Sequence, residues 1–223
     1  MKTNENLQKD VQNAIKWEPL LNAAEIGVTA KDGVITLTGT VDSYAKKIEA
    51  EHAAKNVAGV TVVVEKIDIV YGTSSLTTDN EIAKEVLSAL KWKWEVPSDK
   101  IKVKIEKGWV TLEGELKWNF QKEAAKSAIK NLTGVLGVSN DITIKSESQD
   151  AVEENLIRDA ISRNWSFNNK DIHVKVDGTR VTLSGIVDSL YQKDEAARIA
   201  WNAPGVWSVD NELVVEYNYA MID

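Results

Sequence analysis

One stretch of the sequence occurs three times, and this repeat limits what the chain can fold into. Its copies begin at Gly33 (GVITLTGTVDSYAKKIEAEHAAKNVAGV), Gly108 (GWVTLEGELKWNFQKEAAKSAIKNLTGV) and Thr179 (TRVTLSGIVDSLYQKDEAARIAWNAPGV). The copies are offset by 75 and then by 71 residues. Repeats at a regular spacing indicate repeated structural units, so we expect three units of about 70 residues, each near the lower size limit for a self-sufficient core.

Hydrophobic periodicity predicts the same order of elements in every unit. An amphipathic helix comes first, and two strands of alternating apolar residues follow, joined by a glycine-containing turn typical of a hairpin. A helix rich in alanine then leads to a third strand. The predicted fold class is α+β, with three tandem α-β-β-α-β units, each a three-stranded sheet with two helices on one face. The predicted domains span residues 1–72, 78–147 and 150–218.

Glycines mark equivalent points in the three units. The first set ends each second strand, and the other set suits the left-handed conformation that ends a helix; the sets are Gly39, Gly114 and Gly185, and Gly59, Gly134 and Gly205. Thr78 and Glu81 have the spacing of a capping box at the start of the middle unit. The third unit has Glu153 where the other two have Leu7 and Ile82.

These patterns resemble those of the BON domain (bacterial OsmY and nodulation). The resemblance rests on I-x-V, then (I/V)-T-L-x-G-x-(V/L), then G-V-x-x-V, found in all three units at Ile26, Ile35 and Gly59, at Ile101, Val110 and Gly134, and at Ile172, Val181 and Gly205. Asn140 and Asn211 fit a polar position of the family's third strand, from which Glu65 departs. The chain is similar to the soluble triple-BON proteins of bacteria. The resemblance implies a binding module for phospholipid or other envelope ligands, active in osmotic or envelope stress, without catalytic residues or a cofactor.

The charge of the chain disfavours nucleic acid as a partner. The net charge is −7 overall, and it is −2 over residues 1–72, +1 over 73–147 and −6 over 148–223. Binding to a duplex depends on neutralising phosphates, so only the middle unit could meet an anionic surface. No apolar run approaches the length of a transmembrane segment. The N-terminal residues lack the apolar region of a secretory signal, so we expect a cytoplasmic location for the sequence as written and a periplasmic one if a signal was removed.

The middle unit carries an unusual group of aromatic and basic residues: Trp92, Trp94, Lys102, Lys104, Trp109, Trp118 and Phe120. The lysines alternate with the apolar residues of the first strand and are therefore expected on the open face of the sheet. Trp109 is expected on that face too. Tryptophan beside lysine is typical of the boundary between water and an anionic membrane. One interpretation is therefore contact with an anionic phospholipid surface.

Two other interpretations of the aromatic residues stay open. The group could pack between units or in a subunit interface, because aromatic residues are enriched in interfaces as well; this would make the chain a scaffold for protein partners or a homo-oligomer without lipid affinity. Separately, four tryptophans that follow the first helices are expected to close the cores, as residues after short amphipathic helices commonly do: Trp17, Trp92, Trp94 and Trp165.

A lysine occupies the same early position of the second helix in all units: Lys47, Lys122 and Lys193. A cation near a helix N-terminus opposes the helix dipole, so a local stabilising role is not the obvious explanation. A phosphate contact and an ordinary solvated lysine are the two alternatives.

Nothing in the sequence points to catalysis. His52 and His173 have no second metal ligand at a suitable spacing, and no metal site is predicted. Glu113 and Glu115 flank a glycine, but no other unit has a matching pair for glycoside chemistry. No glycine-rich loop opens a helix, so nucleotide binding is unsupported. The sequence favours a non-enzymatic binding module.

Overall fold

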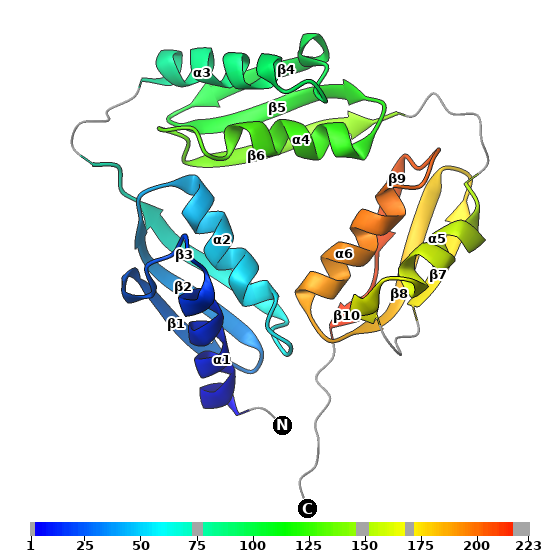
Figure 1. The fold of residues 1–223 in the computed structure, drawn as a ribbon, viewed down its shortest axis with the longest axis horizontal. Helices are drawn as coiled ribbons and strands as arrows, with labels where there is room; N and C mark the ends of the chain where they lie inside the picture. The colour runs from blue at the N-terminus through cyan, green and yellow to red at the C-terminus, as the bar shows by residue number, and fades with distance from the viewer. Residues whose placement is uncertain (1–2, 73–77, 146–151, 168–171, 216–223) are drawn as a thin grey trace, which may run out of the picture. The chain divides into compact units, whose positions relative to one another are not determined.

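The structure is a computed structural model that describes residues 3–72, 78–145, 152–167 and 172–215. It contains three repeated units, and each has the predicted order of helix, strand, strand, helix and strand (Figure 1). The α+β fold class is therefore confirmed.

The first unit consists of α1 (Asn4–Trp17), η1 (Ala23–Glu25), β1 (Ile26–Lys31), β2 (Val34–Val41), α2 (Tyr44–Lys55) and β3 (Val62–Ile69). The middle unit consists of α3 (Asp79–Trp92), η2 (Ser98–Lys100), β4 (Ile101–Glu106), β5 (Trp109–Leu116), α4 (Asn119–Ile129) and β6 (Gly137–Ile144). The third unit consists of α5 (Glu154–Ser162), η3 (Trp165–Phe167), β7 (Ile172–Asp177), β8 (Arg180–Val187), α6 (Leu190–Trp201), β9 (Ser208–Asn211) and β10 (Val214–Val215).

The second strand of each unit lies at the centre of a small mixed sheet. In the middle unit β5 pairs antiparallel with β4 and parallel with β6. The third unit departs from the prediction of a single last strand, because β9 and β10 are separate and both pair parallel with β8. The break falls at Glu212 and Leu213, where the Asn211 side chain accepts a hydrogen bond from the Leu213 amide at 3.3 Å.

Each core lies between the two helices and one face of the sheet. In the third unit, Ile157 of α5 and Ala196 of α6 share a buried cluster with Val174 and Leu183 from the sheet. Alternate residues of the strands are buried and exposed, as in β7 and β8. Both helices therefore cover the same face, as predicted, and the opposite face of the sheet is open (Figure 1).

The prediction that each second strand ends at its glycine is wrong, because the strands run two residues further, to Val41, Leu116 and Val187. In the first and middle units this glycine is required by a close approach of two backbones. Gly39 has a φ of 126°, and a Cβ placed there would lie 2.0 Å from the Glu25 carbonyl oxygen. At Gly114 a Cβ would lie 2.3 Å from the Lys100 carbonyl oxygen. The later glycines also have the predicted positive φ, but they lie in turns beyond the helix ends rather than at the helix termini: Gly59 (98°), Gly134 (89°) and Gly205 (83°).

In the middle unit, the N-terminus of α3 is hydrogen-bonded to the turn between β4 and β5. Thr78 and Glu81 form the predicted capping box at the start of α3. The carboxylate of Asp79, one residue later, accepts hydrogen bonds from the amides of Lys107 and Gly108, both at 2.8 Å. Asp79 therefore links the start of α3 to the turn of the sheet.

Candidate functional site

The open sheet face of the middle unit carries part of the predicted aromatic and basic group. Lys102, Lys104 and Trp109 are all exposed, at alternate positions of β4 and β5. Trp109 is 52% exposed and pairs with Gly137 in the ladder. A Cβ at Gly137 would lie only 2.3 Å from the Trp109 ring, so the indole lies across the neighbouring strand.

Acidic residues balance the lysines on this face. The Nζ of Lys104 lies 3.1 Å from a carboxylate oxygen of Glu106. Lys102 is paired in register with Glu113, which is paired in turn with Asp141 of β6. The open face is therefore not a cationic surface, although it exposes an indole.

The other aromatic residues of the predicted group belong to the helical layer. Trp92 ends α3 and Trp94 follows it, and these side chains are 84% and 89% exposed. Trp118 and Phe120 lie at the start of α4, at 36% and 50% exposed. The structure therefore brings Trp109, Lys102 and Lys104 together and places the remaining aromatic residues on separate elements.

The prediction that four tryptophans close the cores is wrong, because Trp17, Trp92, Trp94 and Trp165 are exposed by 79% or more. Trp17 and Trp92 each come two residues after the last buried position of their helix, Ile15 and Leu90. Two residues correspond to about 200° around a helix, so these side chains point away from the sheet.

The cores are closed by residues that the sequence argument missed. Val96 in the middle unit and Phe167 in the third occupy equivalent positions and are 6% and 4% exposed. Each comes two residues after an exposed tryptophan, and this short-range alternation was the available signal.

The repeated lysines join the second helix to the last strand. The Nζ atoms of Lys122 and Lys193 donate to the carbonyl oxygens of Ile142 and Leu213, both at 2.7 Å. In return, the side-chain amides of Asn140 and Asn211 donate to the carbonyl oxygens of the same two lysines, at 2.8 and 2.7 Å.

This reciprocal pair of hydrogen bonds gives the lysines a structural role in the middle and third units. It also accounts for the polar position in the third strand. The ammonium groups already bind backbone carbonyls, so a phosphate would have to compete with those contacts.

No metal or catalytic centre emerges from the part of the chain that the structure describes. Within it, no three His, Cys, Asp or Glu side chains gather as metal ligands. His52 and His173 are exposed, as are Glu113 and Glu115. Among these residues, no helix combines the length and hydrophobicity needed to span a bilayer.

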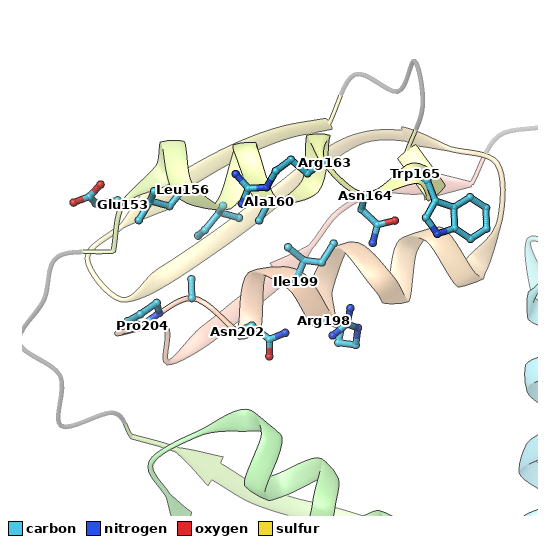
Figure 2. A pocket seen from close by; sticks show the side chains of 12 residues that line it. Glu153, Leu156, Ala160, Arg163, Asn164, Trp165, Arg198, Ile199, Asn202 and Pro204 are labelled. Carbon is cyan, nitrogen blue, oxygen red and sulfur yellow. The ribbon is translucent and has the colours of Figure 1, made fainter.

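A groove of about 750 Å³ lies between α5 and α6 of the third unit (Figure 2). Its middle is apolar and is lined by Leu156, Ile157, Ala160, Ile199 and Ala203. A volume between about 300 and 1,000 Å³ with a mainly apolar lining is typical of small-molecule sites.

Two cationic side chains, Arg163 and Arg198, also line the groove, and Trp165 lies at one end of it (Figure 2). Arg198 donates to both carboxylate oxygens of Glu195, at 2.6 and 2.7 Å. Asn164 also donates to Glu195, at 3.0 Å, so this carboxylate joins α6 to the end of α5. The hydrogen bonds from Arg198 lower the pKa of Glu195 below its ordinary value. Arg163 reaches back along α5 toward Ala160 (Figure 2) and forms no ion pair with another described residue.

Comparison with known protein families matches the BON domain at residues 3–71, 78–146 and 149–217. These matches cover most of the sequence. The chain belongs to the BON domain family. The resemblance inferred from the repeated motifs is therefore confirmed, and the three units are tandem BON domains.

Two curated relatives share part of the sequence. The Osmotically-inducible protein Y of Escherichia coli (strain K12) is 33% identical over an alignment of 134 residues, and the match covers 56% of this chain and 64% of the relative. The 21 kDa hemolysin of Actinobacillus pleuropneumoniae is 30% identical over an alignment of 132 residues, and the match covers 58% of this chain and 64% of the relative. The chain thus spans slightly less than two thirds of the length of these relatives.

Among solved structures, the chain is similar to CdsD, a structural protein of the type III secretion system of Chlamydia trachomatis. The C-terminal domain of CdsD is 16% identical, with 95% of this chain and 98% of that chain covered and a TM-score of 0.26. A second CdsD structure is 17% identical, with 94% and 91% covered and a TM-score of 0.24. These scores are too low to support a structural comparison of the whole chain.

The groove differs from its counterparts in the other BON domains at several equivalent positions. Leu156 replaces Asp10 and Glu85, and Ile199 replaces Ala53 and Ala128, so the third domain has larger apolar side chains. Ala203 replaces Val57 and Leu132, which removes volume from the same place. Glu153, the anomaly noted in the sequence, is exposed and lines the groove, whereas Leu7 and Ile82 at its position are buried. The corresponding hollow of the first domain is smaller, about 420 Å³, and includes Asp10 and Glu18.

Proposed function

We propose that this chain is a non-enzymatic module that associates with anionic phospholipid surfaces during osmotic or envelope stress. The middle BON domain makes the contact. One observation carries this proposal: Trp92 and Trp94 are 84% and 89% exposed at the end of α3, and the neighbouring Lys91 is exposed as well.

Indole rings favour the interface between water and lipid. A lysine near an anionic membrane contributes about 1 kcal/mol of binding. The Lys91–Trp94 segment therefore combines the two kinds of side chain that such a surface attracts. The middle domain is also the only one with a net positive charge, +1 over residues 73–147.

The curated relatives support the same setting. One is named for osmotic induction and the other is named a hemolysin. Osmotic stress and lysis of cells both involve a membrane. The BON family has no known catalytic activity, which supports a binding role in place of an enzymatic one.

Co-sedimentation with vesicles tests the proposal. The full chain should sediment with vesicles of phosphatidylglycerol but not with vesicles of phosphatidylcholine, and binding should weaken at high salt because the attraction is between surface charges. The double variant Trp92→Ala/Trp94→Ala should lose most of the binding. Trp17→Ala is the matched control, because Trp17 has the same position in the first domain and is 87% exposed but is followed by Glu18.

A further variant tests the open sheet face. If Trp109→Ala abolishes vesicle binding and Trp92→Ala/Trp94→Ala does not, the contact lies on the open face of the sheet. If the wild-type chain binds neither kind of vesicle but associates with itself or with a protein, the alternative holds and the chain is an interaction scaffold.

A further inference from the structure

The groove between α5 and α6 is a candidate binding site in the third BON domain, separate from the middle-domain surface. Leu156 and Ile199, which line its apolar middle, stand at positions where the third domain differs in sequence from its duplicates. Leu156 is 57% exposed at a position that is acidic in the other two domains. An apolar side chain exposed beside a hollow of about 750 Å³ indicates a surface that a ligand can cover.

We propose that this groove binds the anion of a fatty acid, with the acyl chain along the helices and the carboxylate at Arg163. The chain would lie over Leu156, Ala160 and Ile199 and enter the hollow left at Ala203.

The charges favour an anionic head group. Arg163 lines the groove and has no ion-pair partner among the described residues. Arg198, which also lines the groove, is already bound to Glu195, so it contributes less. The acidic residue of the groove, Glu153, lies at the end opposite Trp165 (Figure 2). A single carboxylate placed at Arg163 would therefore meet a cation that pairs with no other described residue, and it would avoid the end that carries Glu153.

The length of the groove suits an extended acyl chain. The α5 helix has nine residues, which corresponds to about 14 Å of length. A medium-length acyl chain fits that span.

The test is isothermal titration of the full chain with dodecanoate below its micelle concentration, with dodecanol as the uncharged comparison. One equivalent of dodecanoate should bind saturably. Dodecanol should bind about ten-fold more weakly, as should dodecanoate to Arg163→Gln, because a charge-assisted contact is lost.

Two groove variants should abolish binding, and both copy residues of the middle domain. Ala203→Leu fills the hollow with the side chain found at Leu132, and Leu156→Glu introduces the residue found at Glu85. Leu87→Glu is the control, because Leu87 is 56% exposed on the first helix of the middle domain. Circular dichroism should show that all these variants remain folded.

Three results would overturn the inference: no saturable binding by the wild-type chain, binding that survives both groove variants, or equal affinity for dodecanol and dodecanoate. The site is independent of the middle-domain surface. Trp92→Ala/Trp94→Ala should therefore bind dodecanoate normally even if it no longer binds vesicles.

Discussion

The middle and third BON domains have the same order of elements but present different helical surfaces. Both bury Val86 or its counterpart Ile157 against the sheet, and both join helix to strand through a lysine and an asparagine. The middle domain ends its first helix in exposed indoles, whereas the third opens a groove between its helices. This comparison indicates that the fold depends on the buried residues. The exposed residues of the helices can therefore differ between domains.

The largest expected effect is a difference in stability between two variants of the third domain, one at Phe167, which closes the core, and one at the nearby exposed Trp165. Phe167→Ala should reduce the stability of the third domain by about 3–5 kcal/mol, because it leaves a cavity. Trp165→Ala should change stability by less than about 0.5 kcal/mol, because its side chain is exposed. Hydrogen exchange of the full chain, resolved by domain, measures both. Equal losses would mean that the indole also belongs to the core.

The next effect tests a feature that the domains share. Gly39→Ala should cost about 3 kcal/mol, because the new Cβ meets the Glu25 carbonyl oxygen and the positive φ is strained. Gly72→Ala is the control, because a Cβ there has nothing within 4 Å. Denaturant unfolding of the first domain, followed by hydrogen exchange, should distinguish the two. A stable Gly39→Ala chain would show that the two backbones can separate at little cost.

A smaller effect tests the link between helix and strand. Lys122→Ala should cost about 1–2 kcal/mol, because it leaves the Ile142 carbonyl without its charged donor. Lys102→Ala, on the open sheet face, should cost less than about 0.5 kcal/mol. Unfolding of the middle domain measures the difference, and the same comparison can be made with Lys193→Ala in the third domain. If Lys122→Ala is neutral, the repeated lysine has no structural role.

The smallest effect depends on pH and is confined to the third domain. The folded state lowers the pKa of Glu195 below its ordinary value of 4.5. The stabilisation is therefore complete above pH 4.5 and is lost as the pH falls through the lower folded value. At pH 7, Glu195→Gln should cost less than about 1 kcal/mol, because Arg198 is largely exposed.

At about pH 3 the difference between the wild-type chain and Glu195→Gln should shrink. The middle domain has Ala124 and Ser127 at these two positions and should show no such dependence. Hydrogen exchange at the two pH values measures both domains at once. An undiminished difference at low pH would mean that the charge of Glu195 is not what stabilises the domain.

The sequence predicted most of the architecture because the signals were local and occurred three times. Alternation placed Lys102 and Trp109 on the open face, and the spacing of Thr78 and Glu81 predicted the capping box. The tryptophans were misjudged because hydrophobicity alone does not decide burial. Burial also depends on the position of a residue around the helix axis. Trp92 lies about 200° around α3 from the buried Leu90, so its indole points away from the sheet.

The sequence by itself determined the repeat, the order of elements, the anchoring glycines and the family, because each depends on residues close together in the chain or at equivalent positions. Only the tertiary structure revealed the lysine and asparagine link, since Lys193 and Leu213 are brought together by packing of α6 against the last strand. The same holds for the groove, because its lining comes from two helices. The shape of the groove depends on the small side chain of Ala203 as much as on the larger side chains of Leu156 and Ile199.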